Sequence, residues 1–337
     1  MDRHPTCTDA RLLGTSSLQH QRDNVNLRKS ARAAVVAFAA MALALTGCSG
    51  QTARQDDGKK LSVYATTGYL ADAVANIAPD AEITTMVGPG GDPHTYQPST
   101  QDIEKMRSAD LVFWNGLNLE AHMTSQLESF GDRQLAVGSK VPEKLLLPWP
   151  EKDDKGRPLH DPHIWNSPEA WLIAVDSVAD KIAEADPKNE KTYRANAEKY
   201  KEKIRAAVSK ADAKLAKIDA PRILVTGHDA FNYFGKHFDL EVHATDFIST
   251  EAKRSAKEID DLATLIASKK IPTIFLDNQA NPQAIKSLQE AVHAKGWDVK
   301  ISDAELYADS LGAEPGVDTY LGAFTHNVDA VAEGLGK

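Results

Sequence analysis

Three histidines in this chain stand in settings suited to binding a metal ion. His94 lies in residues 90–96, Gly-Gly-Asp-Pro-His-Thr-Tyr, where the glycines permit a sharp turn and the proline fixes its own φ. His163 ends a second Asp-Pro-His sequence, and His228 follows the apolar run 223–226 and one glycine. Each histidine therefore follows a predicted strand or a proline-stiffened turn. Taken together, the three predict a metal site.

A fourth ligand is needed to complete a tetrahedral set with three imidazoles. A carboxylate suits that position, and the second half of the chain offers several acidic residues. Their spacing does not choose among them, so the candidates stay open at this point: Asp229, Asp246, Asp277, Asp303, Asp309 and Asp318.

Predicted strands and helices alternate along the chain, which favours parallel α/β layers. Short apolar runs at 61–66, 83–87, 111–114, 223–226 and 274–276 are separated by segments with helical spacing. His94 and His228 both follow the carboxyl end of a predicted strand. Ligands bind in the crevice at such strand ends in open α/β sheets.

A long helix is predicted over 187–218, where apolar or small residues recur in steps of three and four. At about 1.5 Å per residue it measures roughly 48 Å, more than one small domain needs. We therefore expect two Rossmann-like lobes, residues 61–186 and 219–337, joined by one rigid backbone helix. An ordinary amphipathic surface helix is the alternative.

The N-terminus is typical of a targeting segment. Arg28, Lys29 and Arg32 precede an apolar run over 33–45, which is too short for a membrane span of about 20 residues. The run ends in Leu-Thr-Gly-Cys, which resembles a bacterial lipobox. We expect residues 1–47 to be a signal peptide, Cys48 to carry lipid, and 48–60 to be a flexible tether. A plain secretory signal is the alternative.

The composition is that of an ordinary globular protein, 42% hydrophobic and 26% charged. A net charge of −9 provides no basic footprint for nucleic acid. The two cysteines, Cys7 and Cys48, fall in the predicted leader and at the lipidation site. We therefore expect neither a disulfide nor a cysteine-based zinc site in the mature protein.

Several motifs, in order, resemble those of the cluster A-I solute-binding lipoproteins of zinc and manganese ABC importers. The resemblance covers nearly everything after Cys48. The matching segments are 91–96 with 102–103, 111–120, 161–165, 227–234, 307–312, 318–320 and 326–328.

This resemblance implies a ligand set and a role. It maps the metal ligands onto His94, His163, His228 and Asp318, and makes Zn²⁺ or Mn²⁺ the transported ion. It also implies an ABC permease with its ATPase as partners, a monomer, and lipid anchoring on the extracytoplasmic face of the cell membrane. Many manganese binders of the family have Glu where this chain has His228. We expect zinc first and manganese second, although the His/Asp-rich loop of zinc-dedicated members is absent.

Three other functions compete with zinc capture. One is a manganese-specific binding protein of the same kind. Another is a secreted zinc hydrolase, which needs an open coordination position and a general base. The chain has no His-Glu-x-x-His or equivalent helical pair, so we do not expect an enzyme. The third is surface adhesion by an exposed lipoprotein.

Overall fold

Parallel strands flanked by helices form the first half of the molecule. The computed structural model describes residues 60–153, 155–250 and 254–336, which belong to one compact unit spanning 58–337. Its first sheet has the strand order β2-β1-β3-β4 with every neighbouring pair parallel. The strands are β1 (Ser62–Ala65), β2 (Glu82–Thr85), β3 (Leu111–Trp114) and β4 (Gln134–Ala136). The helices that follow the first three are α1 (Gly68–Ile77), α2 (Thr100–Ser108) and α3 (Thr124–Glu128).

Local signals explain where these helices begin. Thr67 caps α1 by accepting a hydrogen bond from the backbone N–H of Leu70. A capping box begins α2, because the Ser99 hydroxyl accepts from Asp102 N and the Asp102 carboxylate accepts from Ser99 N. The capping box fixes the residue at which α2 begins. The loop that carries His94, between β2 and α2, therefore ends at a fixed point.

A hairpin and a helix follow the first sheet. Strands β5 (Pro148–Lys152) and β6 (Pro158–His160) pair antiparallel, and α4 (Pro168–Ala185) begins with Ser167 as its cap. Short 3-10 helices lie between these elements: η1 (Ala121–Met123), η2 (Gly131–Arg133), η3 (Val137–Lys140), η4 (Glu143–Leu145) and η5 (Ile164–Asn166).

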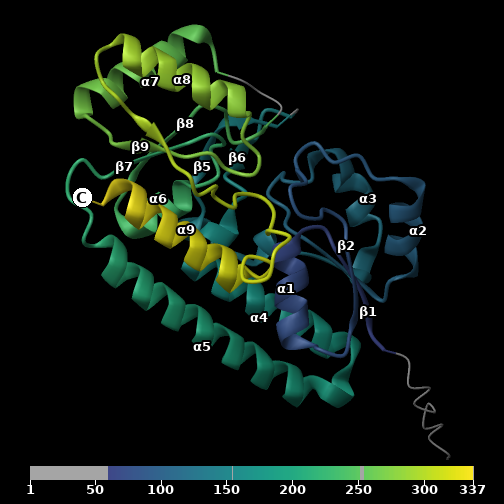
Figure 1. Cartoon of the computed structure of the whole chain (residues 1–337). Coiled ribbons are helices and arrows are strands. Elements are labelled where there is room, and N and C mark those ends of the chain that lie inside the picture. Colours follow the sequence, from purple (N-terminus) through teal and green to yellow (C-terminus); the bar gives the residue numbers. More distant parts are fainter. Residues whose placement is uncertain (1–59, 154, 251–253, 337) are drawn as a thin grey trace, which may run out of the picture. The chain divides into compact units, whose positions relative to one another are not determined.

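The second half repeats the layered arrangement. Strands β7 (Ile223–Thr226) and β8 (Glu241–Ala244) are parallel, as are β9 (Thr273–Ile274) and β10 (Lys300–Ile301). A backbone hydrogen bond of 2.8 Å from Phe275 N to Val225 O joins the two pairs. Figure 1 shows α7 and α8 on one side of these strands and α6 and α9 on the other. These helices are α6 (Asn232–Phe238), α7 (Ala256–Lys269), α8 (Pro282–Ala294) and α9 (Tyr320–Leu335).

Alternating side chains of β7 divide between the two helical layers. Ile223 and Val225 are buried in a cluster with residues of α7 and α8, whereas Leu224 is buried in a cluster with residues of α6 and α9. This is the period of two expected for a strand buried on both faces. The predicted α/β class, with parallel strands flanked by helices, is confirmed.

The long helix α5 (Glu190–Leu215) has 26 residues and is preceded by the 3-10 helix η6 (Pro187–Asn189). It is therefore three residues shorter at each end than the predicted range 187–218. After Leu215 the chain tightens into 3-10 turns, because Lys217 N donates to Lys214 O and Ile218 N donates to Leu215 O. The Nη1 of Arg222 also donates to the carbonyls of Leu215, at 3.1 Å, and Ile218, at 2.7 Å, and so holds this turn.

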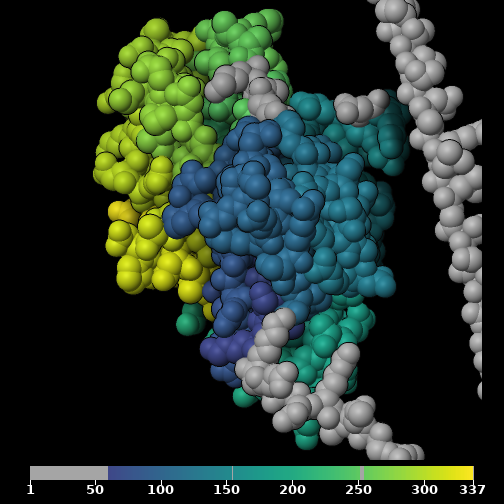
Figure 2. All heavy atoms as spheres, turned by 90° about the vertical axis from the view of Figure 1, so that its right-hand side faces the viewer, coloured from purple at the N-terminus to yellow at the C-terminus, as the bar shows by residue number. Residues whose placement is uncertain are grey.

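Helix α5 joins the cores of the two halves. Tyr193 and Tyr200 pack in the core of the first half, and Ala211 and Leu215 pack in that of the second. Figure 1 shows α5 running alongside both halves. The core of the first half also contains Tyr320 of α9. On the face presented in Figure 2, the two halves lie directly against each other.

The predicted signal peptide, Cys48 and nearly all of the tether lie outside the described residues. Among the residues that the structure does describe, no helix is long and apolar enough to cross a membrane. The lobe boundaries at 186/187 and 218/219 remain predictions.

Candidate metal centre

Four side chains, far apart in the sequence, come together between the two halves. They are His94, His163, His228 and Asp309, and one ligand atom from each lies within 4.8 Å of all the others. His94 is 3% exposed and the other three are fully buried. The three histidines singled out by the sequence are thus brought together.

Short distances join the three imidazole Nε2 atoms and the carboxylate. His163 Nε2 lies 3.3 Å from His94 Nε2 and 3.2 Å from His228 Nε2. Asp309 Oδ2 lies 3.1 Å from His228 Nε2 and 3.4 Å from His94 Nε2, and Oδ1 lies 3.3 Å from His163 Nε2. Neither Asp309 oxygen has a hydrogen-bond partner within the described part of the chain. A buried carboxylate without hydrogen bonds is costly, and a cation between the four groups would satisfy it.

These separations match the edges of a metal-centred tetrahedron. Bonds of about 2.0 to 2.1 Å to zinc imply ligand–ligand edges of about 3.3 to 3.4 Å. The distances above run from 3.1 to 3.4 Å. The four groups are therefore spaced closely enough to share one small ion.

The structure does not bring Asp318, the fourth predicted ligand, to this group. Asp318 is exposed, and its Oδ1 accepts a hydrogen bond of 3.0 Å from Gly316 N in the turn before α9. Asp309 follows Leu306, which pairs with Asp277 beyond the end of β9. We therefore correct the fourth residue to Asp309. Asp309 is one of the six aspartates that spacing leaves open. Because Leu306 pairs with Asp277 like a strand residue, Asp309 follows the carboxyl end of a strand, where open α/β sheets bind ligands.

The loop carrying His94 is held by Asp92 and by the second half. The Asp92 carboxylate accepts from His94 N at 2.8 Å and from the Thr250 hydroxyl at 2.6 Å. The Ser310 hydroxyl, next to Asp309, accepts from Gly90 N at 3.0 Å. Gly90 has a φ of 72°, which favours glycine there. The loop is therefore fastened directly beside two of the four side chains.

His163 is oriented by the acidic residue two positions before it. Asp161 Oδ1 lies 2.7 Å from His163 Nδ1 and also accepts from His163 N at 3.0 Å. Burial opposes a charged imidazole, but the carboxylates of Asp161 and Asp309 overcome it and raise the pKa of His163 to about 10. With the proton on Nδ1, the Nε2 lone pair points to the centre of the group.

His228 is oriented by backbone and by another buried carboxylate. Its Nδ1 lies 3.0 Å from Phe247 O, and Asp277 Oδ2 accepts from His228 N at 2.8 Å. Burial raises the pKa of Asp277 to about 6. For His228, burial would lower the pKa, but the Asp309 carboxylate reverses the direction. Asp277 is one of the candidate ligands from the sequence. It binds the backbone N–H of His228 and does not belong to the metal group.

A family model described as "Zinc-uptake complex component A periplasmic" matches residues 63–334. The chain belongs to this family. The family supplies the metal-binding component of an ABC importer, so this member is a solute-binding protein with a buried metal site and not an enzyme.

Members of this family that resemble the chain are named for different metals. The manganese-binding lipoprotein MntA of Bacillus subtilis is 34% identical over 90% of this chain and 98% of its own length. The iron-binding protein YfeA of Yersinia pestis is 32% identical over 92% of this chain and 97% of its own. The solved periplasmic zinc-binding protein TroA of Treponema pallidum superposes with a TM-score of 0.77 and 32% identity, covering 83% of this chain and all of its own.

Four histidines outside the metal group have partners of their own. His326 Nε2 lies 2.8 Å from Glu305 O and its ring packs on Tyr307. His237, His243 and His293 each lie within 3.2 Å of a nearby carboxylate oxygen. None of these side chains belongs to the metal group.

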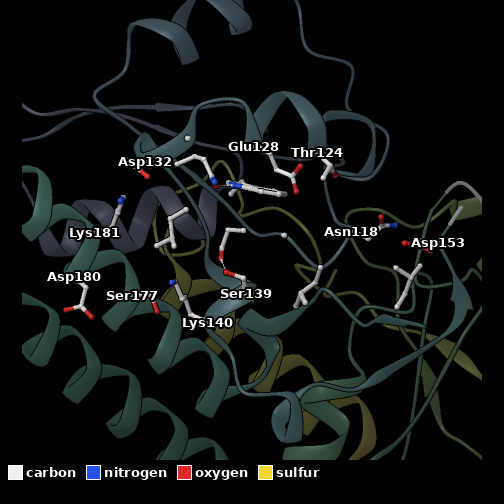
Figure 3. A pocket seen from close by; sticks show the side chains of 18 of the residues that line it. Asn118, Thr124, Glu128, Asp132, Ser139, Lys140, Asp153, Ser177, Asp180 and Lys181 are labelled. Atoms are coloured by element: carbon white, nitrogen blue, oxygen red, sulfur yellow. Dashed lines mark hydrogen bonds between the residues drawn. The ribbon is translucent and has the colours of Figure 1, made fainter. Parts of the chain in front are cut away.

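Two hollows of this family member differ in their relation to the metal group. One, of about 750 Å³, is shown in Figure 3 with Asp180 and Lys181 of α4 on one side and Glu128 of α3 on another. Its lining contains none of the four grouped residues. A smaller hollow of about 350 Å³ is lined by His94 together with Asn118 and Trp149. His94 thus faces this smaller hollow.

Proposed function

We propose that this family member captures Zn²⁺ at His94, His163, His228 and Asp309 and delivers it to an ABC permease driven by its ATPase. One observation carries this proposal. The fully buried Asp309 carboxylate accepts no hydrogen bond from the described residues, yet three imidazole Nε2 atoms lie 3.1 to 3.4 Å from its oxygens. A divalent ion at the centre would balance the charge and satisfy all four groups.

Ligand chemistry supports zinc over the other metals named among the relatives. Imidazole nitrogen suits Zn²⁺, and an N/O site normally binds Zn²⁺ more tightly than Mn²⁺ or Fe²⁺. The short separations among the four groups also correspond to bonds of zinc length. The names of the relatives specify manganese, zinc and iron, so they do not choose between these ions.

Manganese transport is the second candidate, and the Asp309 carboxylate favours it. Its two oxygens face different histidines, Oδ2 toward His94 and His228 and Oδ1 toward His163. A carboxylate in that orientation can donate both oxygens. Five donors would suit a larger ion that prefers oxygen ligands.

The location of the protein belongs to the same proposal. Lipid on Cys48 would anchor the chain to the extracytoplasmic face of the cell membrane, with 48–60 as tether, 61–186 and 219–337 as the two lobes, and 187–218 as their connection. The name of the Bacillus relative, which calls it a lipoprotein, supports this arrangement. We expect the protein to act as a monomer with the permease.

Metal content and competition test the proposal. A soluble form beginning after Cys48 is purified, stripped with chelator, and dialysed against equal Zn²⁺ and Mn²⁺ before elemental analysis. We expect one equivalent of zinc, and a shift toward manganese in His228→Glu, because the substitution replaces a nitrogen ligand by oxygen. Retention of manganese in the presence of equal zinc would make the protein a manganese carrier. Absence of any tight divalent ion would overturn the proposal.

A further inference from the structure

We propose that Asn232 is a positioning residue that holds His163 in its metal-binding orientation from the other half of the molecule, acting through Asp161. The proposal rests on the function proposed above. It deepens that function by naming residues that set the affinity without touching the ion.

The first link is the contact between Asp161 and His163. Asp161 is fully buried, and its Oδ1 lies 2.7 Å from His163 Nδ1. A carboxylate at the outer nitrogen of a metal-binding imidazole fixes the ring and its tautomer, and loss of such a partner typically costs about 10- to 100-fold in metal affinity. The orientation of His163 Nε2 therefore depends on where Asp161 is held.

The second link comes from helix α6 of the second half. Asn232 Nδ2 donates to Asp161 Oδ2 at 3.1 Å, and the Tyr233 hydroxyl donates to Asp161 O at 2.9 Å. The same Tyr233 hydroxyl accepts from Leu147 N at 3.0 Å. Side chain and backbone of Asp161 are thus fixed by the first two residues of one helix. Asn232 is the residue of this pair that reaches the carboxylate.

Helix α6 is also attached to His228. It begins four residues after that histidine, and the segment between them contains Asp229, which forms an ion pair of 3.6 Å with Arg254. The start of α6 therefore stands in fixed relation to His228 and, through Asn232 and Asp161, to His163. Asn232 therefore links the helix that follows His228 to the carboxylate that orients His163.

Charge supports the same assignment. Asp309 among the imidazoles and Asp161 behind His163 are both fully buried and together would supply two negative charges. Two carboxylates balance one divalent ion, and the amide of Asn232 satisfies the second oxygen of Asp161 without adding charge. A buried pair without such compensation would be costly.

A double-mutant cycle on zinc affinity tests the coupling. Zinc binding to the stripped protein is measured by competition with a chelator for wild type, Asp161→Ala, Asn232→Leu and the double variant. We expect a loss of about 10- to 100-fold for Asp161→Ala and about fivefold for Asn232→Leu. If Asn232 acts through Asp161, the double variant should match Asp161→Ala alone.

Two controls separate positioning from a general structural effect. Asn196→Leu removes another amide donor, which bonds Ile77 O at 3.0 Å far from the metal group, and should leave zinc affinity unchanged. In the zinc-bound protein, where Nε2 is the ligand atom, the shifts of His163 Nδ1–H should indicate a strong hydrogen bond to Asp161 in wild type and a weaker one in Asn232→Leu, with no such change in Asn196→Leu. If Asp161→Ala does not fold, Asp161→Leu replaces it, since leucine fills the buried volume and cannot accept from Nδ1–H.

The outcomes distinguish the two proposals. A wild type that binds no zinc overturns the proposed function. A wild type that binds zinc while the losses of the two single variants multiply, or while Asn232→Leu has no effect, overturns the positioning role alone.

Discussion

At the residue scale, Asp309 is the side chain on which the metal group depends. Asp309→Ala removes the carboxylate that is grouped with the Nε2 atoms of three buried imidazoles, and we expect zinc affinity to fall at least about 100-fold, since a metal ligand is lost outright. Asp318→Ala is the matched control, because that carboxylate is exposed and bonds only to its own turn. Isothermal titration calorimetry with zinc measures the affinity of both variants and shows which carboxylate binds the ion. An unchanged Asp309→Ala would remove this residue from the site.

Proton competition should make zinc binding pH-dependent. Without metal, the pKa of His163 is raised to about 10, after Asp161 and Asp309 overcome the opposing effect of burial. The ring is therefore doubly protonated at every pH below about 10, and zinc must displace the proton on Nε2. Affinity should fall about tenfold per pH unit on going from pH 8 to 7. Asp309 adds no such competition, because His228 and His163 hold the pKa of its carboxyl well below the usual range despite burial.

Calorimetry in buffers of different ionisation enthalpy measures the protons released on binding. We expect the release of at least about one proton for each zinc ion bound at pH 8. A constant affinity between pH 8 and 6.5, with no proton released, would contradict the histidine-rich site.

The histidines could be recognised from sequence because each follows a strand or proline-stiffened turn. Asp309 had no such signal, since Leu306 before it forms a single bridge to Asp277 and lies in no apolar run long enough to predict a strand. Spacing left six aspartates open, and family resemblance pointed to Asp318, nine positions too far along the chain. The contact that identifies Asp309 is long-range, and local sequence does not encode it.

At the element scale, the strand ends that carry the histidines tolerate little added volume. A Cβ at Gly227, just after β7, would lie 2.2 Å from Ala280 Cβ and 2.9 Å from Asp277 Oδ2. We expect Gly227→Ala to lower the free energy of unfolding by about 1 to 3 kcal/mol and to weaken zinc binding by displacing His228. Gly88→Ala, near the end of β2, meets nothing within 4 Å and is the control. Denaturant unfolding checks both, and equal stabilities would refute the packing argument.

Helix limits were predictable where local chemistry sets them. The range 100–108 of α2 agrees with its capping box at Ser99 and Asp102. Helix α5 is shorter than the predicted range 187–218, because the chain forms 3-10 turns at both ends of that range. Apolar spacing alone does not distinguish such turns from α-helix. Strand order β2-β1-β3-β4 depends on pairing between distant segments, which apolar runs do not specify.

At the scale of the whole molecule, two separate features connect the two halves. One is the metal group, and the other is helix α5. His94 and His163 come from the first half, and His228 and Asp309 come from the second. Helix α5 contributes Tyr200 to one core and Leu215 to the other. A bound ion should therefore stabilise both halves together.

Thermal unfolding tests this connection. An ion that binds only the folded state, at 1,000 times its dissociation constant, adds about 4 kcal/mol, which for a chain of this size raises Tm by roughly 10 °C. Because the ligands are shared, we expect one transition to move as a whole when zinc is added and to return with chelator. Asp309→Ala should show no such shift. Two transitions, with only one responding to zinc, would mean that the halves unfold independently and that α5 does not transmit the stabilisation.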